Sequence, residues 1–231
     1  MIPFALNELC HLFFPHYCHG CGVGLYDRKL PLCASCLNTL PRTQFAAIPN
    51  NPIERIFIGR LNIIAGFSEF YFSKSGLIQA LIHQLKYHHN SSIGIFLGNL
   101  TGYSLLHSKR FNQFDALIPL PLHTDKMYKR GYNQAEIICT GIAEKTGIPV
   151  IKNNVQRIRY TSTQTKKTRI ERWENVKDSF VVKNPASLAY KKLILVDDVL
   201  TTGATLEACG SVLLKIPGVS LGILTLAYAN K

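Results

Sequence analysis

The sequence has no apolar run that approaches the roughly 20 residues needed to span a bilayer. Its first fifteen residues, MIPFALNELCHLFFP, are apolar, but they contain Glu8 and lack a basic start and a small-residue cleavage site, so they do not have the form of a signal peptide. Internal repeats and low-complexity tracts are also missing. With 47% hydrophobic and 17% charged residues, the composition excludes a disordered chain. We therefore expect a folded, cytoplasmic protein without a membrane span.

Acidic residues are few. The chain has 14 Asp and Glu against 26 Lys and Arg, which gives a formal net charge of +12. Such an excess favours a polyanionic partner or phosphorylated ligands, although a generally basic soluble surface would give the same total. The distribution favours a function, because the cations gather in two segments. These are Lys109, Arg110, Lys126, Lys129 and Arg130, and then Lys152, Arg157, Arg159, Lys166, Lys167, Arg169 and Arg172.

The seven cysteines include two CxxC pairs separated by eleven residues, Cys18 with Cys21 and Cys33 with Cys36. Two CxxC turns can present four thiolates to one point, the tetrahedral set that structural zinc prefers. The same residues could instead form two disulfides, but nothing else indicates an oxidising compartment. The sequence therefore predicts a zinc site. The remaining candidates are His16 and His19 as substitute ligands, and Cys10, Cys139 and Cys209 as buried apolar residues.

Composition and periodicity divide the chain into three parts. Residues 1–45 are a lead-in and a zinc ribbon, residues 46–74 are a linker followed by a β-hairpin over 53–72, and residues 75–231 are an α/β domain. In the last part, helical spacing over 75–108 precedes a strand at FDALIPLPL and a helix at GYNQAEIICTGIAEKTG. Further strands are predicted at IPVIKNNVQRI, DSFVV, KKLILVDD and VSLGILTLAYA, with a long basic loop over 157–175 and a helix over 202–216. The alternation predicts a parallel sheet with right-handed crossovers.

The stretch LILVDDVLTTGAT, residues 193–205, ends a predicted buried strand in two adjacent carboxylates, Asp197 and Asp198. The carboxyl ends of parallel strands form the ligand crevice of an open α/β sheet. The turn after the strand opens a helix, so its N–H groups can bind phosphate, and the adjacent carboxylates suit ribose hydroxyls. The structural alternative is a polar strand end followed by Thr201 or Thr202 as a helix cap.

This stretch resembles the phosphoribosyl-pyrophosphate (PRPP) signature of type I phosphoribosyltransferases. Other segments narrow the resemblance to the ComF/GntX family: IPLPLH followed by KRGYNQAEIIC, LKYHHN at residues 85–90, the four-cysteine ribbon, and TSTQTKKTRIERWENV. The last of these has Thr161, Gln164, Arg172 and Asn175 at the family's spacing. The motifs follow the family's order along nearly the whole chain. Lys167 departs from the pattern, because an apolar residue is more usual there.

The resemblance implies a type I phosphoribosyltransferase-like parallel sheet with helices on both faces, preceded by the zinc ribbon and the β-hairpin. It implies that Asp197 and Asp198 bind the ribose of PRPP and that Mg²⁺ accompanies this ligand. The 5′-phosphate would be bound by Thr201, Thr202, Gly203, Ala204 and Thr205, and pyrophosphate by the loop Leu120, Pro121, Leu122 and His123. The basic and lid residues would be Arg130, Asn133, Gln164, Lys166, Lys167 and Arg172. For Arg130 and Asn133 the alternative of capping the next helix stays open.

Members of this family are implicated in DNA uptake during natural transformation, so single-stranded DNA and DNA-uptake proteins are expected partners beside PRPP. Two hypotheses about function remain. In the first, the protein transfers phosphoribosyl from PRPP to an acceptor that no residue identifies. In the second, it is a non-catalytic sensor of PRPP or a nucleotide, and its basic segments bind single-stranded DNA.

Overall fold

The computed structural model describes residues 16–27, 29–87, 90–158 and 179–229. At its centre lies a four-stranded sheet in the order β3 (Ala65–Tyr71), β8 (Ser220–Tyr228), β7 (Lys192–Leu200), β4 (Ala116–Pro119), and every neighbouring pair is parallel. A parallel bridge between Leu117 and Val150 continues the sheet beyond β4. The predicted parallel sheet is therefore confirmed.

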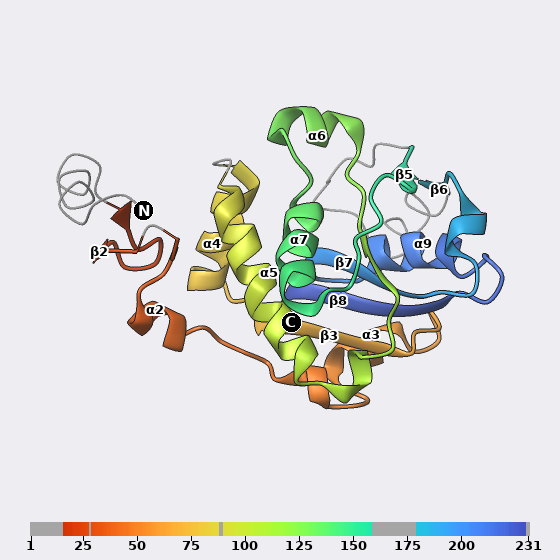
Figure 1. Cartoon of the computed structure of the whole chain (residues 1–231), viewed down its shortest axis with the longest axis horizontal. Helices are drawn as coiled ribbons and strands as arrows, with labels where there is room; N and C mark the ends of the chain where they lie inside the picture. The colour runs from red at the N-terminus through yellow and green to blue at the C-terminus, as the bar shows by residue number, and fades with distance from the viewer. Residues whose placement is uncertain (1–15, 28, 88–89, 159–178, 230–231) are drawn as a thin grey trace.

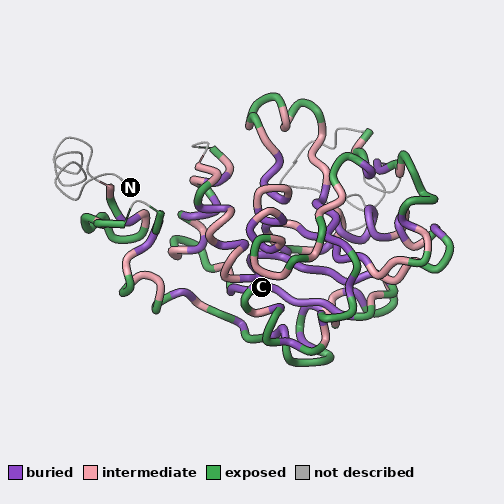
Figure 2. The backbone as a smooth tube through the Cα atoms, viewed as in Figure 1, coloured by how far each residue is buried: buried purple, intermediate pink, exposed green. Residues whose placement is uncertain are grey.

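Helices cover both faces of this sheet (Figure 1). From β4 the chain passes through α7 (Gln134–Thr146) to residue 150, which lies beyond β4 at the edge of the sheet. From β7 it passes through α9 (Ala204–Leu213) to β8, which lies on the other side of β7 from β4. Because crossovers between parallel strands are right-handed, α7 and α9 lie on opposite faces. Figure 2 shows the buried residues along the strands and on the inner sides of these helices. The fold is a mixed α/β fold of the predicted class.

The long helix α5 (Ser91–Leu106) packs directly on α7, and α4 (Leu77–Tyr87) precedes it. Small residues make this contact possible. A Cβ at Gly98 would clash with the carbonyl oxygen of Ile138, and one at Gly141 would clash with that of Ile95. Backbone therefore lies against backbone where the two helices cross, which explains why α5 contains several glycines at four-residue spacing.

The β-hairpin predicted for residues 53–72 is wrong. The structure has helix α3 (Pro52–Phe57) there, followed by strand β3, which pairs with β8 in the main sheet. Asn51 starts α3 by accepting hydrogen bonds from the N–H groups of Ile53 and Glu54, and Pro52 occupies the first turn. These start signals outweigh the strand preference of the RIFI residues. Since β3 belongs to the main sheet, the α/β domain begins before residue 75.

Two smaller sheets flank the main one. The predicted strand over residues 148–158 is divided: Val150 bridges to Leu117, whereas β5 (Val155–Arg157) pairs in antiparallel fashion with β6 (Phe180–Val182). The other elements are β1 (His16–Tyr17) and β2 (Gly24–Leu25), α2 (Ala34–Asn38), α6 (Thr124–Arg130), and the 3₁₀ turns η1 (Phe45–Ala47), η2 (Lys109–Phe111) and η3 (Pro185–Leu188). Within the described ranges, no helix combines the length and hydropathy of a membrane-spanning segment.

The segment after the cysteine ribbon runs along the outer edge of β3. The N–H of Thr43 donates to the carbonyl of Glu69 (2.9 Å), and the N–H of Tyr71 donates to the carbonyl of Pro41 (2.8 Å). The Arg42 guanidinium forms an ion pair with the buried Glu69 carboxylate. The edge of the sheet is thus covered by the chain that leads out of the ribbon.

Candidate functional site

The sheet changes direction between β4 and β7, because the connections from these two strands leave toward opposite edges. Ligands of open α/β sheets bind at the carboxyl ends of strands at such a point. The last residue of β4, Pro119, pairs with Val196, and the N–H of Leu120 donates to the Val196 carbonyl (2.8 Å). Beyond Val196, β7 continues without this neighbour, so Asp197 and Asp198 lie past the end of β4. The structure thus confirms that the Asp pair lies at the carboxyl-terminal edge of the sheet, although β7 itself continues to Leu200.

Asp197 and Asp198 are adjacent, but they have different environments. The Asp198 carboxylate is buried and forms an ion pair with the Lys86 ammonium at 2.8 Å. Burial raises the pKa of Asp197, and the charge of Asp198 raises it further, to about 7. The N–H of Asp198, which donates to Asp197 Oδ1 (2.8 Å), and the charges of Lys86 and Arg157 oppose this rise. The site therefore holds one carboxylate paired with lysine and a second whose negative charge is costly in the free protein.

The turn after β7 presents backbone N–H groups. Gly203 has a left-handed φ of 76° and is the N-cap of α9, without a side-chain capping bond. Within the described ranges, the N–H groups of Thr202, Gly203, Thr205 and Leu206 have no hydrogen-bond acceptor. Ala204 has only a long contact of 3.5 Å from its N–H to the Thr202 hydroxyl. These donors sit at the positive end of the α9 dipole, which is the arrangement that binds anions.

Positive side chains converge on the acidic pair from three elements. The pKa of Lys126 on α6 is lowered by partial burial, and then by the nearby charges of Arg157, Arg130 and Lys86, whereas Asp198 raises it. Such crowding of like charges costs free energy unless an anion balances it. Arg130 also lies over the ring of Tyr87, 5.4 Å from its centroid, and donates to Gln134 Oε1 at 2.9 Å. The cluster therefore brings four cations and two carboxylates together at this end of the sheet.

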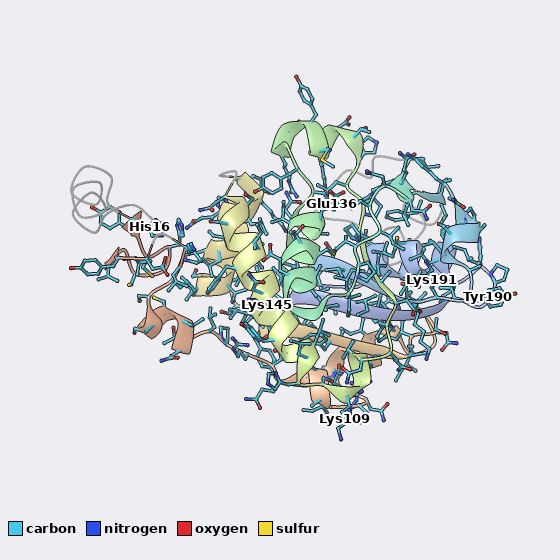
Figure 3. The ribbon with its side chains drawn as sticks, in the orientation of Figure 1. His16, Lys109, Glu136, Lys145, Tyr190 and Lys191 are labelled. Atoms are coloured by element: carbon cyan, nitrogen blue, oxygen red, sulfur yellow. The ribbon has the colours of Figure 1, made fainter. Side chains whose placement is uncertain are left out.

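The predicted pyrophosphate loop, Leu120 to His123, lies beside this cluster. His123 is the N-cap of α6, where its Nδ1 accepts from the N–H of Asp125 (3.3 Å). Asn133 caps α7 by accepting from the N–H of Ala135, and its amide also donates to the Leu120 carbonyl (3.0 Å). A pocket of about 350 Å³ opens here. It is lined in part by Pro121, Leu122, His123, Met127, Glu136 and Arg157, and Figure 3 labels Glu136 near the amino end of α7.

Several residues of the cluster were not predicted from the sequence. Lys86 was seen only as part of the LKY motif, Lys126 and Arg157 only as members of basic segments, and Gln134 only as part of RGYNQ. Gln134 is buried, and its Nε2 has no hydrogen-bond partner within the part of the chain that the structure describes. Gln164, Lys166, Lys167 and Arg172, predicted as lid residues, lie outside the described residues, as do Thr161 and Asn175.

The four ribbon cysteines come together as predicted. The Sγ atoms of Cys18, Cys21, Cys33 and Cys36 all lie within 4.8 Å of one another. They are free thiols in the structure, so the alternative of two disulfides is not what the fold adopts. Burial opposes ionisation of Cys18, but hydrogen bonds from backbone N–H groups and from Cys36 lower its pKa to about 6. A thiolate held beside three further thiols suits one soft metal ion. Cys139 and Cys209 are buried as predicted, whereas Cys10 lies outside the described residues.

The ribbon also contacts the α/β domain directly. The side chains of Asn90 and His19 form a hydrogen bond of 3.2 Å between Nδ2 and Nε2. Gly20 lies so close to Leu77 that a Cβ there would be 3.0 Å from its side chain. His19, a candidate substitute ligand by sequence, therefore lies where it connects the ribbon to the start of α5.

Comparison with known proteins agrees with these features. The chain is 30% identical to competence protein F of Haemophilus influenzae over 209 residues, which are 88% of this chain and 80% of that protein. It is 29% identical to the DNA utilization protein YhgH of Salmonella typhimurium over 201 residues, 86% of this chain and 78% of that protein. The competence protein ComFC of Bacillus subtilis is 32% identical over 99 residues, 43% of this chain and 38% of that protein.

Among solved structures, glutamine PRPP amidotransferase from B. subtilis, complexed with ADP and GMP, matches 61% of this chain and 30% of that chain. Its TM-score is 0.40 and its sequence identity 17%. No protein-family model matches the chain. The identity to competence protein F extends over most of both proteins, and the cysteine ribbon and the α/β sheet lie in the order that the motifs predicted. The chain belongs to the ComF family of competence proteins.

Proposed function

We propose that the protein binds PRPP at the carboxyl ends of β4 and β7. In this arrangement Asp197 and Asp198 accept hydrogen bonds from the ribose hydroxyls. The N–H groups of Thr202, Gly203 and Thr205 receive the 5′-phosphate, with Thr201 and Ala204 completing the loop. The observation that carries this proposal is the row of N–H donors that have no acceptor among the described residues, placed directly after the acidic pair at the point where the sheet changes direction.

The cations complete the fit to a polyphosphorylated sugar. Arg130 and Arg157 both lie close enough to Lys126 to repel its charge, and a pyrophosphate group would relieve that repulsion. The pyrophosphate would lie at the loop Leu120–His123 beside α6. The Mg²⁺ that accompanies PRPP would offset the negative charge of the pyrophosphate, and Asp197 and Asp198 carry the hard oxygen ligands that this ion prefers. The carboxylates of the site are compatible with such an ion.

Phosphoribosyl transfer is the first hypothesis for the step after binding. The bond between C1′ of the ribose and the pyrophosphate oxygen would break, a bond from C1′ to the acceptor would form, and pyrophosphate would leave with both electrons. The residues of this chain would contribute by holding ribose and pyrophosphate in place and by stabilising the leaving charge. The structure identifies no acceptor, so the transferase hypothesis and the sensor hypothesis share this binding site.

A second candidate function is binding of single-stranded DNA in the cytoplasm during DNA uptake, as the relatives' names suggest. The observation that favours it is α6, where Tyr128 is 93% exposed between the cations Lys126 and Lys129. Exposed aromatic rings between cations bind bases by stacking and phosphates by charge. DNA-uptake proteins would then be partners of this chain.

We further propose that the metal of the ribbon is a structural zinc ion bound by Cys18, Cys21, Cys33 and Cys36. All four positions would be occupied by thiolates, which leaves no open position for catalysis. Its contribution would be to fold residues 16–40 and to hold them against α4 and α5.

Calorimetry tests the PRPP site. PRPP with Mg²⁺ should bind with an affinity that Gly203→Val abolishes, because a side chain at Gly203 would be strained at a φ of 76° and would lie close to Phe57 and Ile56. Gly24→Ala is the matched control, since a Cβ there meets no atom within 4 Å. Pyrophosphate release in the presence of bases or DNA would then separate transferase from sensor. Absence of PRPP binding by the wild-type protein would refute the proposed function.

A further inference from the structure

Arg60 lies in the turn between α3 and β3. Its side chain contacts the turn after β7, residues 201–203, from the side of α3. Its side chain is 16% exposed and pairs with the Glu207 carboxylate in the first turn of α9 (10% exposed). Nε donates to Glu207 Oε2 at 2.9 Å. Nη1 donates to two backbone carbonyls, that of Thr202 at 2.9 Å and that of Ile56 at 3.1 Å. One guanidinium therefore connects α3, the turn and α9.

The bond to Thr202 has a geometric consequence. A trans peptide group directs its C=O and its N–H to opposite sides. When Arg60 holds the carbonyl of Thr202, the N–H of Gly203 in the same peptide group must point away from Arg60. This carbonyl does not accept from the N–H of Leu206, as it would in a longer helix, and that N–H has no acceptor in the described ranges. Arg60 thus favours the turn in which N–H groups are available to an anion.

Phe57, the last residue of α3, lies against this turn beside Arg60. A Cβ at Gly203 would lie 3.1 Å from two atoms of the Phe57 ring, so the turn rests on α3. The Arg60 guanidinium lies 5.8 Å from the centroid of that ring. Because Glu207 pairs with it, the positive charge is balanced next to the positive end of the α9 dipole.

We propose that Arg60, held by Glu207, is a positioning residue that fixes the orientation of the Thr202–Gly203 peptide group and thereby sets the affinity for the ligand phosphate. This inference rests on the proposed function, since it assigns a determinant of the same anion site. Arg60 touches no ligand in this scheme. It acts through the backbone of the turn.

The test replaces Arg60 with Lys, which keeps the charge but has no planar fork that can hold two carbonyls and a carboxylate at once. PRPP affinity, measured by calorimetry with Mg²⁺, should fall at least about tenfold, because small displacements of preorganised donors are costly. In the ligand-free protein, the NMR signals of the Gly203 and Thr205 amides should shift. Glu207→Gln should act in the same direction and provides a second variant if Arg60→Lys does not fold.

Arg110→Lys is the matched control. Arg110 also pairs with a partly buried glutamate, Glu54, and also donates to a backbone carbonyl, that of Ile48, but it does not contact the turn. Its replacement should lower thermal stability while PRPP affinity and the Gly203 signal stay unchanged. If Arg60→Lys lowers stability without changing PRPP affinity, or if both Arg variants weaken binding equally, the positioning role is refuted.

The two proposals fail in different ways. If the wild-type protein binds neither PRPP nor inorganic phosphate, the proposed function is wrong, and the amide signals of Gly203 and Thr205 still decide on Arg60. If these signals shift in Arg60→Lys but not in Arg110→Lys, the positioning role is supported. If they are unchanged in Arg60→Lys, it is overturned.

Discussion

Replacing Asp197 with Asn should make the free protein more stable while it weakens PRPP binding. Burial and the charge of Asp198 raise the pKa of Asp197 from 3.8 to about 7, so its ionised form is unfavourable in the folded state. One pKa unit corresponds to about 1.4 kcal/mol, which sets an upper limit of roughly 4 kcal/mol on the cost of that charge. We expect the unfolding free energy of Asp197→Asn to exceed that of the wild type by roughly 1–3 kcal/mol at pH 8. The gain is below the limit because Asp197 titrates together with neighbouring groups, so its whole pKa shift does not belong to Asp197 alone. Asn retains the oxygen that accepts from the N–H of Asp198.

The pH dependence of this gain has a defined sign. A carboxylate whose pKa is higher in the folded protein costs no stability below the pKa of the unfolded chain. The cost grows between about pH 4 and pH 7 and is complete above the folded pKa. The difference in unfolding free energy between Asp197→Asn and wild type should therefore be large at pH 8 and small near pH 4, as measured by urea unfolding.

Asp198→Asn is the comparison variant for this experiment. Asp198→Asn removes the same repulsion between the two carboxylates. It also breaks the ion pair between Asp198 Oδ2 and Lys86 Nζ, which are 2.8 Å apart. We therefore expect no gain in stability, or a loss. Calorimetry should show PRPP binding weakened at least about tenfold in both variants, since a hydrogen bond to a charged group contributes about 1.5–3 kcal/mol. Equal stability of Asp197→Asn and wild type at pH 8 would refute the electrostatic reasoning, and unchanged PRPP affinity would refute the ribose-binding role.

Three further predictions concern other parts of the molecule. Metal analysis should find about one zinc ion per chain, lost in Cys18→Ser together with thermal stability, and a metal-free protein with an unchanged melting curve would contradict the ribbon assignment. Exchange of Lys126 and Lys129 for Gln should flatten the slope of log affinity against log salt for single-stranded DNA, and an unaltered slope would leave α6 without a role in binding. Gly141→Ala should lower the unfolding free energy by roughly 1–3 kcal/mol because its Cβ meets the Ile95 carbonyl, whereas Gly24→Ala should change it little.

Much of the fold was predictable from local patterns, because each pattern corresponds to one element. The glycine at 147 ends α7 in a left-handed conformation, as the predicted helix stop requires. The apolar runs before Asp197 and before residue 229 became the two central strands. The hairpin prediction failed because β-branched and aromatic residues in IERIF favour a strand, while the start signal at Asn51 and burial of Ile53 and Phe57 favour a helix. Which preference prevails depends on packing that the segment alone does not contain.

The site was predictable only where it is contiguous in sequence. Asp197, Asp198 and the following turn stand in one stretch and were predicted together. Lys86, Lys126 and Arg157 reach the same place from α4, α6 and β5, and Arg60 contacts Thr202 across 142 positions of sequence. These contacts follow from the order of strands in the sheet, and no spacing within a single segment indicates them.

The pairing of β3 with β8 has a consequence for synthesis of the protein. Ser68 and Thr225 share a hydrogen bond between their hydroxyls although 157 positions separate them. While the chain emerges from a ribosome, β3 must therefore wait for β8, whereas the four cysteines come out close together and before β3. The ribbon could take up a metal ion early, but the sheet, and with it the carboxyl-terminal edge that holds Asp197 and Asp198, closes only when residues 220–228 have been released. In a chain that stops before β8, one edge of β3 would have no partner strand, and the other edge would be covered only by residues 41–43. The unpaired edge would expose such a chain to aggregation and proteolysis.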